Sequence, residues 1–142
     1  MQTEPRVGCG AAIVVAGRLL LIERLTPPEA GCWGLPGGKI DLFEDARTAT
    51  AREIHEELGI VIDPVDLLCV VDLIDRERGT HWLSPVYLVD RFTGTPVNRE
   101  PGKHRGPEWY PLDALPDRLT TPTIIAVDAY RARQAAVPSD PR

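Results

Sequence analysis

The stretch from Gly38 to Ile60, GKIDLFEDARTATAREIHEELGI, is the most informative part of the sequence. Residues 44–58 have a helical pattern, and Gly59 follows them at the position where a glycine commonly ends a helix. Ile54 and Leu58 are four residues apart and therefore lie on one face, which we expect to pack against the core. The pattern predicts a helix that ends at Leu58.

Three glutamates share the adjoining face of this helix: Glu53, Glu56 and Glu57. Like charges at this spacing destabilise a helix by roughly 0.2–0.5 kcal/mol per pair, and the helix dipole disfavours acids in the last turns. No Lys or Arg follows four residues later to relieve the repulsion. A solvated acidic surface is the alternative interpretation. The arrangement favours a bound cation, because clustered carboxylates suit Mg²⁺ or Mn²⁺, which in turn bridge to phosphate oxygens.

The same stretch resembles the Nudix box of the Nudix hydrolases, G-x5-E-x7-R-E-U-x-E-E-x-G-U, where U is an aliphatic residue. Its defined positions are Gly38, Glu44, Arg52, Glu53, Ile54, Glu56, Glu57, Gly59 and Ile60. At average residue usage the seven fixed residue types would match by chance at roughly one start position in 10⁸. The preceding WGLPGG, the N-terminal hairpin and the final helix also fit, so the resemblance covers nearly the whole chain.

The resemblance implies hydrolysis of a nucleoside diphosphate linked to another moiety, with Mg²⁺ as cofactor or Mn²⁺ in its place. Carried over by position, Glu53, Glu56 and Glu57 are expected to be metal ligands, with the carbonyl of Gly38 as a further oxygen. The expected chemistry is in-line attack of an activated water on phosphorus.

The resemblance also assigns the catalytic roles around this metal site. Arg52 is expected to pair with Glu44 and to hold Glu53 in place, although a surface arginine is the alternative. The general base is either Glu53, which we rank first, or an acid on a downstream loop. Glu100 and Glu108 flank the long polar loop, and Glu100 is the second candidate.

Substrate contacts are expected from residues outside the box. Arg24, at the end of a strand, and Lys39, after the double glycine, are candidates for phosphate binding, or else solvated charges. Trp33 is a candidate to stack on the base, with core packing as the alternative, and His81 is a weaker one. Residues 103–105 form a basic run that either closes over a ligand or is solvated.

The whole-chain composition bounds these expectations. The chain has 142 residues and a mass of 15.6 kDa, with 43% hydrophobic and 26% charged residues, which suits one globular domain. A net charge of -5 excludes a general attraction to nucleic acid or to anionic membranes. We find no signal peptide or membrane-spanning stretch, and the three cysteines cannot all pair within the chain. A cytoplasmic protein is expected.

Apolar runs and turn residues predict a single layered α/β domain over residues 1–142, and the resemblance implies a Nudix fold, an α/β/α sandwich around a mixed β-sheet. The expected elements are strands at 7–16 and 19–25 joined by a Gly17–Arg18 turn, strands at 60–74 and 82–92, a polar loop at 93–107, a helical turn at 112–115, a helix at 121–136 and a frayed tail at about 137–142.

Sequence features outside the box indicate the substrate class. The chain lacks the secondary signatures of the ADP-ribose, diadenosine polyphosphate, NADH and coenzyme A types. The run Glu100-Pro101-Gly102-Lys103 is similar to the downstream pattern of MutT-like nucleoside triphosphate pyrophosphatases. We therefore expect a small-molecule nucleotide, an NTP or dNTP, to be converted to the monophosphate and pyrophosphate.

Other readings of the function stay open. They are an ADP-ribose or nucleotide-sugar pyrophosphatase, a dinucleoside polyphosphate pyrophosphatase, a non-catalytic nucleotide sensor, and a metal-dependent isomerase or transferase. A monomer or a homodimer is expected, with the hairpin and residues 60–74 as the possible dimer contact.

Overall fold

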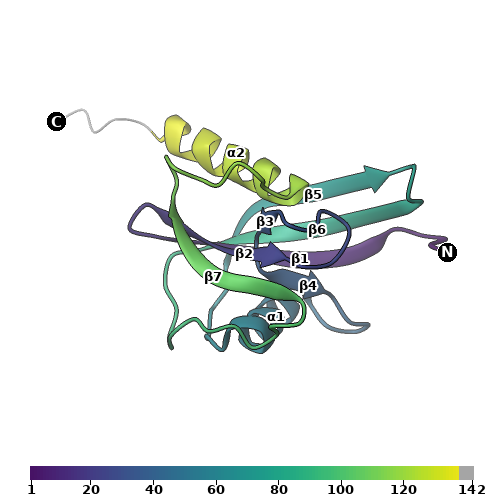
Figure 1. The fold of residues 1–142 in the computed structure, drawn as a ribbon, viewed down its shortest axis with the longest axis horizontal. Coiled ribbons are helices and arrows are strands. Elements are labelled where there is room, and N and C mark those ends of the chain that lie inside the picture. Colours follow the sequence, from purple (N-terminus) through teal and green to yellow (C-terminus); the bar gives the residue numbers. More distant parts are fainter. Residues whose placement is uncertain (138–142) are drawn as a thin grey trace.

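The computed structural model describes residues 1–137, so most of the tail predicted at 137–142 lies outside the described residues. In this part of the chain the elements follow one another in the order shown in Figure 1: β1 (Arg6–Val15), β2 (Arg18–Arg24), β3 (Trp33–Gly34), β4 (Gly37–Lys39), α1 (Ala46–Leu58), β5 (Asp66–Asp75), β6 (Thr80–Val89), β7 (His104–Pro111) and α2 (Thr121–Ala136).

The strands form one mixed sheet with the order β3-β2-β1-β6-β5, to which β4 is added beside β1 and β7 beside β2. The β1–β6 pair is parallel and the other pairs are antiparallel. Helix α1 lies against one face of the sheet, and α2 lies against the other face (Figure 1). The predicted α/β/α sandwich around a mixed sheet is confirmed.

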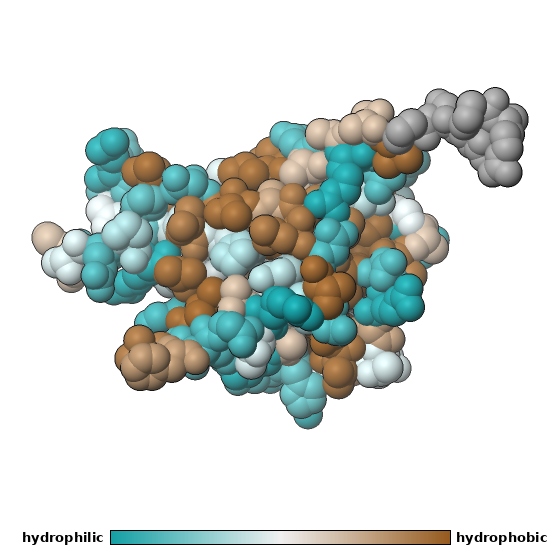
Figure 2. Space-filling model, turned by 180° about the vertical axis from the view of Figure 1, so that it is seen from behind, coloured by the Kyte–Doolittle hydropathy of each residue, from teal (hydrophilic) through white to brown (hydrophobic). Residues whose placement is uncertain are grey.

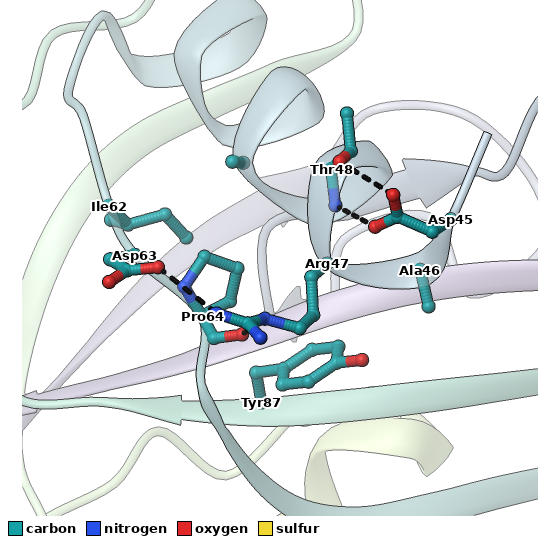
Figure 3. Close-up of a pocket in the computed structure, with 9 residues that line it drawn as sticks. Asp45, Ala46, Arg47, Thr48, Ile62, Asp63, Pro64 and Tyr87 are labelled. Atoms are coloured by element: carbon teal, nitrogen blue, oxygen red, sulfur yellow. Dashed lines mark hydrogen bonds and ion pairs between the residues drawn. The ribbon is translucent and has the colours of Figure 1, made fainter.

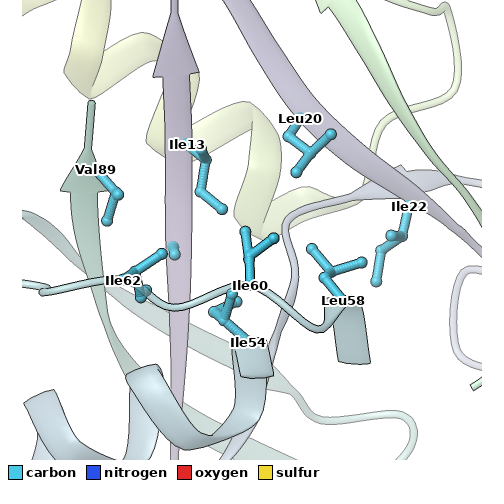
Figure 4. Close-up of a cluster of buried hydrophobic side chains, with 9 residues drawn as sticks. Ile13, Leu20, Ile22, Ile54, Leu58, Ile60, Ile62 and Val89 are labelled. Atoms are coloured by element: carbon cyan, nitrogen blue, oxygen red, sulfur yellow. The ribbon is translucent and has the colours of Figure 1, made fainter. Parts of the chain in front are cut away.

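Alternation along the central strands divides the core between the two faces. Ile13 of β1 and Leu20 of β2 point toward α1, whereas their neighbours Val14 and Leu19 point toward α2. The cluster on the α1 side, drawn in Figure 4, contains Ala11, Ile13, Leu20, Ile22, Ile54, Leu58, Ile60, Ile62 and Val89. The apolar face predicted for the helix is therefore what attaches α1 to the sheet.

The turn of the first hairpin differs by one residue from the prediction. Val15 pairs with Arg18, so the two turn residues are Ala16 and Gly17 rather than Gly17 and Arg18. Both have positive φ, 52° and 73°, as a two-residue turn that follows the twist of the strands requires.

The C-terminal half differs more from the prediction. The polar loop predicted at 93–107 ends earlier, because His104–Pro111 form strand β7 against β2. The helical turn predicted at 112–115 is a turn only, in which the Ala114 amide donates to the Pro111 carbonyl. Of the strand predicted at 60–74, only the part from Asp66 onward belongs to the sheet.

No helix among residues 1–137 is long and apolar enough to span a membrane. Hydrophobic side chains are spread over the side of the molecule turned away in Figure 1 (Figure 2). On strand β5, at the end of the sheet order, Leu67, Val70 and Ile74 are exposed. This strand lies in the region where a homodimer contact was expected.

Candidate active site

Helix α1 has defined caps at both ends, and these fix where its acids lie. Asp45 accepts a hydrogen bond from the Thr48 amide at 2.8 Å, and Gly59 adopts the left-handed conformation with φ of 72°. The helix begins at Ala46, two residues later than predicted, and ends at Leu58 as expected. The glutamates therefore occupy its last two turns.

Arg52 is the centre of an ion-pair network on α1. Its Nε and Nη2 atoms donate to the two carboxylate oxygens of Glu44 at 2.7 and 2.9 Å, a bidentate pair. Its Nη1 atom donates to Glu53 at 3.1 Å and to Glu56 at 3.2 Å, and Nη2 also reaches the Lys39 carbonyl at 3.1 Å. The Arg52–Glu44 pair expected from the sequence forms, and it orients a guanidinium that holds Glu53.

The repulsion among the three glutamates is weaker than the sequence predicts. No basic residue follows the acids at the required spacing, but Arg52 precedes Glu56 by four residues and pairs with it. Arg99, from a distant segment, also donates to the His55 carbonyl in the last turn of α1. The acidic face is therefore partly neutralised within the chain.

Two of the glutamates are withdrawn from solvent. Glu57 is only 6% exposed, and this burial, together with the charge of Glu53, raises the pKa of Glu57 to about 8. The Gly37 amide donates to Glu57 at 3.4 Å and opposes the shift. Burial also raises the pKa of Glu53, against the opposing effect of Arg52. A buried carboxyl beside a partly buried one holds its negative charge poorly unless a cation offsets it.

The glycines of β4 allow these acids to approach the sheet. A Cβ atom on Gly38 would overlap the Glu53 carboxylate, and one on Gly37 would overlap the Cys9 carbonyl of β1. At Gly37 only glycine fits, because its neighbour is the rigid backbone of β1, whereas at Gly38 a side chain would displace the Glu53 carboxylate that lies directly against the backbone.

The donor set at this place fits a hard divalent cation. Among residues 1–137 no three Asp, Glu, His or Cys side chains already converge as a metal cage. The third glutamate of the box, Glu56, is half-exposed and paired with Arg52. Mg²⁺ does not require such a cage, since it keeps several waters and is usually held by one or two carboxylates. Glu53, beside the backbone of Gly38, and Glu57, beside that of Gly37, provide oxygen donors of this kind.

A loop far along the sequence brings Glu100 to the same place. The Val97 amide donates to the Leu58 carbonyl at 3.0 Å, and the Arg99 amide donates to the Glu57 carbonyl at 2.9 Å. The Glu100 carboxylate is near enough to Glu53 and Glu57 for its charge to contribute to the raised pKa values of both.

The other acid considered for a loop position, Glu108, lies elsewhere. It belongs to β7 and accepts a hydrogen bond from the Tyr110 hydroxyl at 3.1 Å. Lys103, by contrast, pairs with Glu100 at 3.1 Å, so the basic run at 103–105 contributes a charge beside the glutamates.

The two phosphate-binding candidates differ in position. Lys39 ends β4, its side chain is exposed, and its carbonyl is bound by Arg52, so it borders the glutamate network. Arg24 ends β2, but its Nε atom donates to the Pro28 carbonyl at 2.8 Å. Only Lys39 is joined to the box residues.

The two base-contact candidates lie outside the network. Trp33 packs in the cluster on the α2 side, edge-on to Tyr110 with 5.1 Å between ring centroids. His81 is bound through Nε2 to Asp72 at 2.6 Å. Neither ring is brought to the glutamates.

Two residues that the sequence analysis did not identify as functional support the Glu100 loop. Asn98 accepts from the Glu100 amide and donates to the His104 carbonyl, and Arg99 binds the end of α1. An asparagine side chain in a loop commonly bonds the backbone amide two residues later, and this turn signal would have pointed to Asn98. His104, which was considered only as part of a basic run, is 4% exposed, and its Nε2 atom has no hydrogen-bond partner among the described residues.

A cavity of about 640 Å³ lies at the opposite end of α1 (Figure 3). It is lined by the first turn of the helix, by Pro64 and by Tyr87, and Arg47 crosses it to donate to the Pro64 carbonyl at 3.0 Å. Its acids are already engaged, since Asp45 caps the helix and Asp63 pairs with Arg47. The candidate active site is therefore the end of α1 and not this cavity.

Residues 4–129 of this chain match the family model of the NUDIX domain. The crystal structure of a MutT NUDIX hydrolase from Burkholderia pseudomallei is similar, with a TM-score of 0.87 and 56% identity over 89% of this chain and 98% of that one. An ADP-ribose pyrophosphatase of Methanocaldococcus jannaschii is 33% identical over 82% of this chain and 68% of its own length. A putative 8-oxo-dGTP diphosphatase 2 of Mycobacterium tuberculosis is 38% identical over 74% and 77%.

Proposed function

Because this chain belongs to the NUDIX domain family and is a Nudix pyrophosphohydrolase, we propose that its substrate is a nucleoside or deoxynucleoside triphosphate. The products would be the monophosphate and pyrophosphate. The observation that carries the proposal is the approach of partly buried Glu53 and buried Glu57 to the backbone of Gly38 and Gly37, respectively. The similarity to the 8-oxo-dGTP diphosphatase supports the triphosphate class.

The metal ligands of this proposal are the box glutamates. Glu53, Glu56 and Glu57 would hold Mg²⁺, or Mn²⁺ in its place, with the Gly38 carbonyl as a further oxygen. Divalent-metal dependence is typical of the family. When bound, the ion offsets the charge of the phosphates and acidifies the attacking water. The raised pKa values of Glu53 and Glu57 support this assignment, because a cation would relieve the repulsion between the two groups.

The residues of the chain then carry the proton and hold the substrate. Arg52, anchored by Glu44, orients the Glu53 carboxylate, which accepts a proton as the water oxygen bonds to phosphorus. The bond from phosphorus to the bridging oxygen breaks, and pyrophosphate leaves. Glu100 is the second candidate for the base. Lys39 and Lys103 lie beside the network, where their charges would favour phosphate.

Further parts of the proposal rest on the sequence. Arg24, Trp33 and His81 remain predictions as substrate contacts, since their observed partners lie elsewhere. A single domain over residues 1–142, a cytoplasmic location and a monomer or homodimer also remain predictions. The exposed apolar residues of β5 are the surface on which a homodimer would form.

A second candidate substrate is ADP-ribose, which the similarity to the M. jannaschii pyrophosphatase favours. The test measures kcat/KM with Mg²⁺ for the common and 8-oxo triphosphates, ADP-ribose, a nucleotide sugar and a diadenosine polyphosphate. We expect the highest value for a triphosphate, with pyrophosphate as product. A highest value for ADP-ribose, with AMP and ribose 5-phosphate as products, would replace the proposal with the second candidate.

A further inference from the structure

The segment from Val97 to His104 carries Glu100 and is fixed at both ends. At its start, the amides of Val97 and Arg99 donate to the last carbonyls of α1, which otherwise lack partners within the helix. At its end, the Lys103 carbonyl accepts from the Leu25 amide, just after β2, at 3.1 Å. The segment therefore spans the gap between the catalytic helix and the sheet.

Asn98 closes this segment on itself. Its Oδ1 atom accepts from the Glu100 amide at 3.0 Å, and its Nδ2 atom donates to the His104 carbonyl at 2.8 Å. Each end of the side-chain amide meets a backbone group of the opposite kind, so only one orientation of the amide satisfies both. Because His104 is buried, the far end of this bridge is a rigid point.

The bridge determines where the Glu100 carboxylate lies. Glu100 belongs to a loop, where its backbone would otherwise be freer than that of the glutamates on α1. Lys103 binds one carboxylate oxygen, but its own side chain is long and exposed. The amides of Lys103 and His104 donate to the Glu100 carbonyl at 2.9 and 3.3 Å, and the Asn98 side chain adds the contact that fixes the Glu100 amide on the other side of the residue.

We propose that Asn98 is a positioning residue for hydrolysis, because its amide holds Glu100 against Glu53 and Glu57. This inference rests on the proposed function, since it gives Glu100 a part in the reaction. Displacement of a reacting group by about 1 Å can cost on the order of 100-fold in rate, so a short side chain outside the reacting groups can control kcat.

The test compares kcat and KM of the full chain and of three variants, with Mg²⁺ and the best triphosphate. Asn98→Ala, which removes both hydrogen bonds, is expected to lower kcat by about tenfold or more with little change in KM. Asn98→Ser keeps a hydroxyl that can accept from the Glu100 amide, so we expect an intermediate kcat. Arg131→Ala is the control, because it likewise removes a hydrogen bond from a side chain to the backbone, that from Arg131 of α2 to the Leu112 carbonyl at 2.7 Å. The kcat of this variant should equal that of the wild type.

A double-mutant cycle separates positioning from general loosening of the fold. Glu100→Gln should lower kcat, and adding Asn98→Ala to it should lower kcat no further. The inference would be overturned if the fold-losses in kcat of the two single variants multiply in the double variant. It would also be overturned by an unchanged kcat in Asn98→Ala, Asn98→Ser or Glu100→Gln. In each of these cases the proposed function would still stand. A wild-type chain that releases no pyrophosphate would overturn the proposed function, and the inference with it.

Discussion

At the scale of single residues, Glu57 has the environment that demands the most explanation. Its carboxyl is almost fully buried beside a second carboxyl, and a backbone amide at 3.4 Å is its hydrogen-bond donor. In a stable fold such a group is either protonated or paired with a cation. The two states lead to separate predictions for the metal-free and the metal-loaded protein.

The metal-free protein should lose stability as the pH rises. The pKa of Glu57 is about 8 in the folded chain, above its ordinary value of 4.5. The folded state therefore binds more protons than the unfolded state between these values, and the free energy of unfolding falls with rising pH across that window. Glu57→Gln cannot ionise, so its fall should be smaller. Urea unfolding in EDTA from pH 5 to 9 measures this, and identical pH profiles would contradict it.

Mg²⁺ should reverse this effect in the wild type. At pH 8 we expect added Mg²⁺ to raise the Tm of the wild type, since a ligand that binds only the folded state stabilises it. Glu57→Gln should show little rise and a kcat lowered by about 100-fold or more, because a neutral amide replaces a buried anionic ligand. Glu77→Gln, at an exposed turn, is the matched control. Full turnover in Glu57→Gln would contradict the metal assignment.

At the scale of elements, the pairing of β4 with β1 behind α1 makes the site possible. Gly37 and Gly38 are adjacent but face different obstacles: a Cβ on Gly37 meets the rigid backbone of β1, and a Cβ on Gly38 meets the movable end of Glu53. The same small substitution should therefore have different consequences at the two positions.

Gly38→Ala should preserve the fold and impair the reaction, because Glu53 can move aside but then leaves its position beside Arg52. Gly37→Ala should lower the Tm by several degrees, since strand β4 must separate from β1. Thermal melts and kcat for both variants test this contrast. A Gly38→Ala variant with wild-type kcat would show that Glu53 need not lie where the structure has it.

The elements also show how far local sequence predicts structure. Helix α1 was predicted nearly to its ends, because Asp45 and Gly59 are local signals. Strand β7 was missed, because Gly106 and Pro107 interrupt its pattern and its observed pairing is with β2 alone, far away in the sequence. The approach of Glu100 to the glutamates depends on backbone bonds between segments about 40 residues apart, which no local pattern contains.

At the scale of the whole molecule, the two faces of the sheet differ in what they carry. The α1 face holds the glutamates and Arg52, whereas the α2 face holds Trp33 in an apolar cluster. The resemblance to the Nudix box was sufficient to predict the Arg52–Glu44 pair, since Arg52 lies on α1 and Glu44 in the loop just before it. The substrate contacts were less predictable, because they depend on which loops the fold brings to that face.

The proposed reaction cleaves a triphosphate between its α- and β-phosphorus atoms. ³¹P NMR of the wild type with Mg²⁺ and one nucleoside triphosphate tests this most directly. We expect equal amounts of monophosphate and pyrophosphate, formed only while Mg²⁺ is present. Release of orthophosphate with a nucleoside diphosphate, or turnover that persists in EDTA, would contradict it.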